Sequence, residues 1–155
     1  MSFNVTVTGD VGDCIATCCE TCTVVDVWAS ISWVSDSDLS RTVRHKVFTD
    51  ETGGAECFST GDLLTSPLTG SAGPYKDSDA DFIPSQIGRV AGAGQYLRHS
   101  LFISAGGTLV VSASAVLKVT LSDGSIIEDT ISLVANESNP VVELAHNIEL
   151  ICEWV

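Results

Sequence analysis

The stretch TLVVSASAVLKVTLSDGSIIEDTISLV, residues 108–134, indicates most clearly how this chain folds. Apolar and polar side chains alternate on both sides of a central Ser-Asp-Gly, and this period of two is typical of a strand with one buried face. Asp123-Gly124 favours a type I′ turn because glycine readily adopts a positive φ. The stretch therefore predicts a long β-hairpin over residues 108–134. The apolar face of its first half contains Leu109, Val111, Ala113, Ala115, Leu117, Val119 and Leu121.

The C-terminal stretch VVELAHNIELICEWV, residues 141–155, alternates in the same way and predicts a long strand with one buried face. His146 is the one strongly polar residue in its apolar row, so we expect a hydrogen-bonded histidine in the core or at an interface. The apolar row consists of Val142, Leu144, His146, Ile148, Leu150, Cys152 and Trp154.

Shorter strands are predicted at 3–8, 23–34, 41–49 and 55–59. We expect residues 1–12 to form an extended arm and residues 65–98 a long contact loop, with a brief helix over 83–90. No βαβ rhythm and no repeat is visible. The sequence therefore predicts an all-β protein with a single domain over 1–155, built as an antiparallel β-sandwich or jelly roll.

Composition limits the classes of partner. The chain has 155 residues and a net charge of −13, from 7 Lys+Arg against 20 Asp+Glu. This balance argues against nucleic acid and anionic membranes as partners, because both require basic patches. No targeting segment and no apolar run of membrane-spanning length is present, so we expect synthesis in the cytoplasm.

Four of the six cysteines lie within nine residues, in DCIATCCETC at positions 13–22. Four thiolates are enough for a tetrahedral zinc site, although zinc sites usually take their ligands from two separated segments. Disulfides and free thiols are the other two interpretations, and all three stay open. The candidates for disulfides are Cys14, Cys18, Cys19, Cys22 and Cys57, and the first four are also weak candidates for metal ligands. Cys152 fits a small apolar core position, or a partner for the cluster.

Asp77, Asp79 and Asp81 have the alternating spacing of a calcium-binding loop. The EF-hand pattern then requires glycine at its sixth position and glutamate at its twelfth, where Phe82 and Gly88 stand. A solvated acidic turn is the favoured interpretation, and weak calcium binding is the alternative. No resident cofactor is expected.

No motif for a nucleophile, a metalloprotease or a phosphate-binding loop occurs, so the sequence predicts a protein that is not an enzyme. His45, between Arg44 and Lys46, is expected on a surface strand, and His99 at the entrance of a strand. Because Trp28 and Trp33 have opposite parity, we expect at least one of them to be exposed. The residues expected to contact partners are Arg41, Arg44, Lys46, Tyr75, Arg89, Tyr96, Arg98 and Trp33.

Three features together resemble the small accessory proteins of tailed-bacteriophage virions, of the capsid cement, decoration, tail or head-completion type. These features are the extended start SFNVTVTGDVGD, the hairpin LKVTLSDGSIIEDTISL and the terminal strand VVELAHNIELICEWV. The resemblance implies a virion structural protein, assembled in the host cytoplasm, that binds other virion proteins and copies of itself. A carbohydrate- or surface-binding sandwich, assisted by calcium, is the alternative, and a protein that uses the Cys14–Cys22 cluster as a metal or thiol site is the third.

Overall fold

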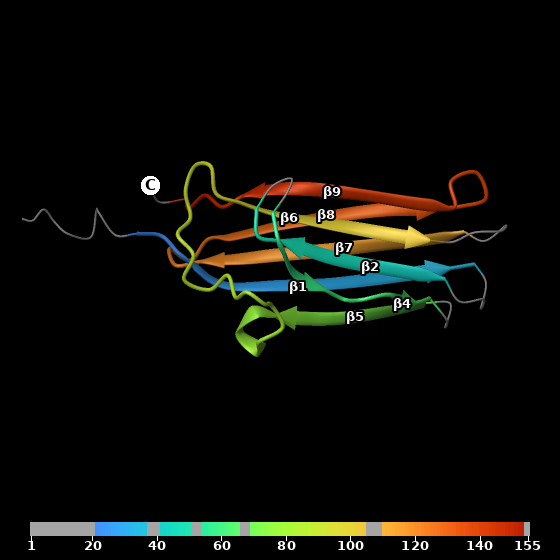
Figure 1. The fold of residues 1–155 in the computed structure, drawn as a ribbon, viewed down its shortest axis with the longest axis horizontal. Coiled ribbons are helices and arrows are strands. Elements are labelled where there is room, and N and C mark those ends of the chain that lie inside the picture. Colours follow the sequence, from blue (N-terminus) through green and yellow to red (C-terminus); the bar gives the residue numbers. More distant parts are fainter. Residues whose placement is uncertain (1–20, 37–40, 51–53, 66–68, 105–109, 154–155) are drawn as a thin grey trace, which may run out of the picture.

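The computed structural model describes residues 21–36, 41–50, 54–65, 69–104 and 110–153, and these form two antiparallel sheets packed face to face (Figure 1). The strands all run along the long axis of the molecule. The prediction of an all-β sandwich is confirmed. The predicted arm over 1–12, the predicted strand at 3–8 and three of the clustered cysteines lie outside the described residues.

The first sheet has the strand order β5-β1-β7-β8. Its members are β5 (Thr69–Lys76), β1 (Val24–Ser35), β7 (Val111–Leu121) and β8 (Ile126–Ala135). The predicted hairpin is confirmed as β7 and β8, which pair from Val111↔Ala135 to Thr120↔Ile126. The predicted two-residue type I′ turn was wrong, because the connection is the three-residue loop Ser122-Asp123-Gly124, in which Gly124 alone has a positive φ, of 89°.

The second sheet has the order β3-β2-β6-β9, and the two-residue strand β4 also pairs with β2. Its members are β3 (Glu56–Ser59), β2 (Thr42–Phe48), β4 (Leu63–Leu64), β6 (Tyr96–Ser104) and β9 (Val141–Glu149). Strands β8 and β9 are edge strands of opposite sheets and lie side by side on one side of the sandwich (Figure 1). We call this side the open seam.

Three further sequence-based predictions were wrong. The last strand ends at Glu149 rather than continuing through 155, and its predicted buried face is interrupted because Leu144 is 43% exposed. The predicted contact loop over 65–98 contains strand β5, a short 3₁₀ turn (η2, Asp77–Asp79) and the beginning of β6. Residues 83–90 form turns instead of a helix. Strand β5 contains two glycines and a proline and so gives weak alternation, which concealed it within the predicted loop. The alternation of the last segment continues beyond Glu149, although its pairing with β6 ends there.

The interior contains two apolar clusters that follow one another along the strands. The first includes Val47, Leu97, Leu117 and Ile148, toward the end where β9 finishes. The second includes Val43, Leu101, Ile103, Ala115 and Ile131, toward the other end. Each strand contributes alternate residues to the interior, as the period of two requires. The position between the clusters is filled by polar side chains, which are described in the next subsection.

Leu101 and Leu144 are direct cross-strand partners with very different burial, which gives a matched test of the core. Leu101 is fully buried, so Leu101→Ala should lower the free energy of unfolding by about 2–5 kcal/mol. Leu144→Ala, at a half-exposed position, should lower the free energy of unfolding by only about 1 kcal/mol or less. Chemical denaturation of both variants measures the difference, and equal losses would contradict the described packing.

Candidate functional site

Three histidines and one aspartate form a connected polar layer across the interior, between the two apolar clusters. The layer consists of His45 on β2, His99 on β6, His146 on β9 and Asp129 on β8. His45 and His99 are fully buried, whereas the side chains of Asp129 and His146 are 34% and 36% exposed. The layer therefore runs from the centre of the sandwich to the open seam.

Strand register brings these residues together. His99 pairs directly with His146 across β6 and β9. His45 lies diagonal to His99, because the opposed pairs are Val47↔His99 and His45↔Leu101. Diagonal neighbours on one face are within reach of long side chains. Asp129 comes from the opposite sheet, in the apolar row between Ile127 and Ile131, so the layer joins the two sheets.

One carboxylate oxygen holds two of the histidines. Asp129 Oδ2 lies 2.7 Å from His99 Nε2 and 2.8 Å from His146 Nδ1. His99 Nδ1 lies 2.9 Å from His45 Nε2, so the chain of contacts continues inward. The His45 ring also makes an edge contact with Phe58, with ring centroids 6.4 Å apart. These distances are typical of strong hydrogen bonds, those to Asp129 being short as expected for a charged acceptor.

Burial keeps the inner histidines neutral. Desolvation, together with the smaller effect of the neighbouring His99, lowers the pKa of His45 to about 3, although the backbone of Ser30 opposes the shift. Desolvation also lowers the pKa of His99, although its hydrogen bond to Asp129 acts in the opposite direction. For Asp129, burial raises the pKa, but the hydrogen bonds from His99 and His146 outweigh burial and hold the pKa below its usual value. The layer therefore contains an ionised carboxylate and neutral inner imidazoles near neutral pH.

The hydrogen-bond directions follow from these charge states. An ionised Asp129 only accepts, so His99 donates its Nε2–H and accepts at Nδ1 from the Nε2–H of His45. His45 then has no proton on Nδ1, and this buried nitrogen makes no hydrogen bond in the structure. A buried lone pair without a hydrogen-bond donor is destabilising, so the inner end of the layer is left unsatisfied.

The sequence analysis misplaced two of these histidines. His45 was expected on a surface strand and His99 at a strand entrance, yet both are in the centre of the sandwich. The prediction of a hydrogen-bonded His146 is confirmed. The signal that was missed is a polar residue at the buried position of an otherwise apolar row, and it recurs from strand to strand. His45 between Val43 and Val47, and Asp129 between Ile127 and Ile131, each interrupt an apolar row at the buried parity.

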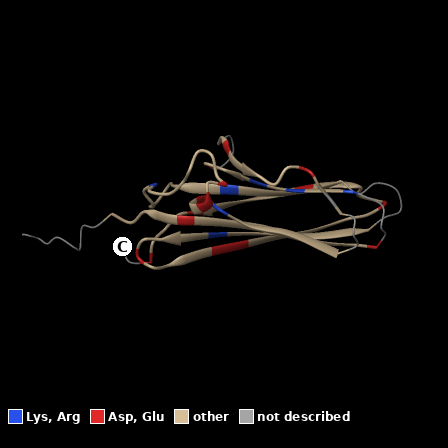
Figure 2. Cartoon of the chain, turned by 90° about the horizontal axis from the view of Figure 1, so that it is seen from below, with Lys and Arg blue, Asp and Glu red and all other residues tan. Residues whose placement is uncertain are grey.

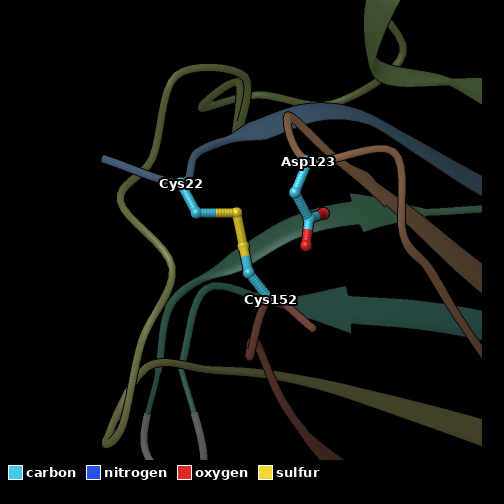
Figure 3. A group of neighbouring side chains, drawn as sticks. All are labelled: Cys22, Asp123 and Cys152. Atoms are coloured by element: carbon cyan, nitrogen blue, oxygen red, sulfur yellow. A yellow bond between two sulfur atoms is a disulfide. The ribbon is translucent and has the colours of Figure 1, made fainter. Parts of the chain in front are cut away.

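A second cluster lies at the end of the sandwich where β1 begins. Cys22 and Cys152 form a disulfide across 130 residues, and the carboxylate of Asp123 lies beside it (Figure 3). Asp123 accepts hydrogen bonds from the backbone N–H of Ser125 and Glu153, and so holds the β7–β8 turn against the C-terminal segment. The bonded sulfurs are not available as thiolate ligands, so this cluster is a fastening between the two sheets.

Cys57 was a disulfide candidate, and this expectation was wrong because Cys57 is a free, buried cysteine. Burial raises the pKa of its thiol to about 12, and the nearby Asp77 adds to the shift while Arg89 opposes it. Cys57 packs in the first apolar cluster as a small apolar residue. Cys14, Cys18 and Cys19 lie outside the described residues.

Two aspartates of the possible calcium loop, Asp77 and Asp81, have other partners. Asp77 is buried and accepts hydrogen bonds from the Ser85 hydroxyl and the Gln86 backbone N–H. Asp81 accepts from the backbone N–H of Lys76. Among the described residues, the groups of three His, Cys, Asp or Glu ligand atoms close enough to hold one ion are the two clusters above, and neither contains Asp77, Asp79 or Asp81.

The residues expected to contact partners are mostly engaged within the chain. Arg44 forms an ion pair with Asp62 and lies over the Phe102 ring, and Lys46 forms an ion pair with Glu56. Tyr75 packs on Phe58, Arg89 donates to the carbonyl oxygen of Thr49, and Arg98 donates to Asn147. Arg41 and Tyr96 are half-buried. Trp33 is only 8% exposed, so its contact with a partner stays a prediction with little exposed surface to support it, and Trp28 is half-buried beneath Lys118.

Comparison of the chain with models of protein families, with curated proteins and with solved structures gives no significant match. Within the described ranges, no helix is long and apolar enough to cross a membrane.

Alkylation and peptide mapping test the cysteine assignment. The native protein should give a Cys22–Cys152 linked peptide, and Cys57 should react only after denaturation. A pKa of about 12 instead of 9 leaves roughly 1000-fold less thiolate at neutral or mildly alkaline pH. Replacing both Cys22 and Cys152 with serine should lower the free energy of unfolding by about 2–5 kcal/mol. Rapid labelling of Cys57 in the native protein would contradict the described burial.

Proposed function

We propose that this protein is a non-enzymatic structural subunit that associates with copies of itself, as accessory proteins of a virion do, through the outer face of the sheet β5-β1-β7-β8. The observation that supports this proposal is an uncharged area on a strongly acidic protein. We call this area the hydroxyl face. It is formed by the outward side chains of four strand segments, 30–34, 69–75, 112–116 and 130–134.

No Asp, Glu, Lys or Arg occurs in these four segments, although the whole chain carries a net charge of −13. In Figure 2, the same strands show long stretches without red or blue. Strand register aligns serines across all four strands, as Ser71↔Ser32, Ser32↔Ser114 and Ser114↔Ser132. The hydroxyl groups of Ser114 and Ser132 lie 2.9 Å apart.

A second row on the same face is more apolar. Val34 pairs with Ser112, which pairs with Val134, and the two valines are 56% and 52% exposed. Exposed apolar side chains beside hydroxyl groups cost little to remove from water, because no charge is desolvated. The central part of a protein interface is typically depleted of charged residues in the same way.

The choice of a second copy as the partner follows from charge. Two molecules with a net charge of −13 repel each other, and the repulsion is smallest where both surfaces are uncharged. The outer face of the other sheet contrasts with the hydroxyl face, because it carries Arg44, Lys46, Arg98 and Glu143. Self-association through the hydroxyl face suits a subunit that is repeated many times in a shell or tube.

Sedimentation velocity across a range of salt concentrations tests this proposal. The wild-type chain should associate, and more strongly as salt screens the repulsion between copies. Ser32→Glu places a carboxylate at the centre of the hydroxyl face and should weaken association at least about tenfold. Ser138→Glu adds the same charge in the exposed β8–β9 connection and is the matched control. A monomer under all conditions, or a Ser32→Glu variant that associates like the control, would overturn the proposal.

The link to virions has a separate test. Mass spectrometry of purified particles from a phage whose genome encodes this chain should detect it in amounts comparable to the other structural subunits. If the protein associates with itself but is absent from particles, the proposal of a structural subunit stands and the proposal that it belongs to a virion is excluded.

A further inference from the structure

We propose that His99, Asp129 and His146 form a binding site for a divalent transition-metal ion of the zinc type, at the open seam between the two sheets. Self-association through the hydroxyl face plays no part in this inference, because the site and that face are separate.

The ligand set is suited to such an ion. Two imidazole nitrogens and one carboxylate oxygen are a common protein ligand set for zinc, with a water in the fourth position. The ligand atoms of the three residues all lie within 4.8 Å of one another. The three residues come from β6, β8 and β9, so they are held by rigid strands rather than by one flexible loop.

The distances require only a small opening of the cluster. His99 Nε2 and His146 Nδ1 each lie within 2.8 Å of the same Asp129 oxygen. Around a tetrahedral ion with bonds of about 2.0–2.1 Å, neighbouring ligand atoms lie about 3.3 Å apart. Side chains that are partly exposed, as those of Asp129 and His146 are, can move by the remaining half ångström without disturbing the core. The same exposure lets an ion enter from the seam.

A metal-bound histidine normally has a hydrogen-bonding partner for its second ring nitrogen, which we call the outer partner, and His45 has this position beside His99. Such a histidine donates its second ring N–H to a fixed acceptor, which sets the tautomer and the orientation of the ring. His99 Nδ1 lies 2.9 Å from His45 Nε2, and His45 is fully buried and fixed by its neighbours. This partner is positioned to act on the ligand without touching the ion.

An observation independent of the ligand distances is the buried nitrogen at the inner end of the polar layer, His45 Nδ1, which makes no hydrogen bond. Without an ion, His99 donates from Nε2 to Asp129, and His45 Nδ1 is left as a buried lone pair without a hydrogen bond. An ion on His99 Nε2 moves the His99 proton to Nδ1, where it is donated to His45 Nε2. The proton of His45 then resides on Nδ1, and the backbone of Ser30, which raises the pKa of His45, is an acceptor close to this ring. Each imidazole keeps one proton, and the buried nitrogen becomes a donor instead of an unused acceptor.

Metal titration of the full-length protein tests the site, with Zn²⁺ and Co²⁺ as probes. The free thiols are first alkylated with the disulfide left intact, so that the cysteines at 14, 18 and 19 cannot bind the ion. One ion per chain should bind to the wild type. Bound Co²⁺ should give visible absorption without the near-ultraviolet band of thiolate ligation. At a Zn²⁺ concentration about 100 times the Kd, the melting temperature should rise by roughly 5–10 °C.

Three variants locate the ion. His146→Gln and Asp129→Asn should each lower the affinity by more than about 100-fold, which exceeds the effect of losing an outer partner. Glu128→Gln removes a neighbouring carboxylate on the outer face of β8 and should bind like the wild type. His146 is half-exposed on an edge strand, so its variant should keep the fold, as circular dichroism would verify. Absence of 1:1 binding to the wild type, or undiminished binding to His146→Gln, would overturn the proposal.

Discussion

The hydrogen bonds from His99 and His146 to Asp129 are the constraint on which the centre of this sandwich depends. A carboxylate in the row between two apolar clusters is destabilising unless its lone pairs are used, and both imidazoles must be aligned to use them. Because Asp129 is on one sheet and the two histidines are on the other, this requirement fixes the position of one sheet relative to the other. A shift of one residue in the register of β9 would turn His146 to the outside and leave His99 as the sole partner of Asp129.

The polar layer and the disulfide fasten the sandwich at different places. The Cys22–Cys152 bond joins the start of β1 to the segment after β9, and the polar layer joins β8 to β6 and β9 near the middle of the strands. The other side of the sandwich, where β5 and β3 are the edges, has the packed aromatic rings of Phe58, Tyr75 and Phe82. The two sheets are therefore fastened to each other at one end, near the middle and along the opposite side, which suits the proposed role as a repeated subunit.

Local alternation in the sequence was sufficient to predict the fold class and the central hairpin, because a period of two is a property of each strand by itself. Asp123-Gly124 marks the place of the β7–β8 turn but not its register, because the observed loop has three residues, Ser122-Asp123-Gly124, where a type I′ turn would have two. The polar layer could not be predicted in full, since it depends on the pairing of β6 with both β2 and β9 and on the packing of β8 from the other sheet. Its members were visible separately, as polar residues at buried positions. The sequence left Cys152 open as a partner for the cysteine cluster but could not select the Cys22–Cys152 pairing for the same reason, because the 130 residues between them leave no local signal.

Long-range ¹H–¹⁵N correlation spectra of the imidazole rings test the central claim most directly, since the chain has only three histidines. In the metal-free protein at neutral pH, we expect His99 to be neutral with its proton on Nε2, and His45 likewise, with both tautomers unchanged as the pH is lowered below 6. Assignment follows from single histidine substitutions. A His99 ring that titrates with an ordinary pKa near 6.5, or that has its proton on Nδ1 in the absence of metal, would contradict the account.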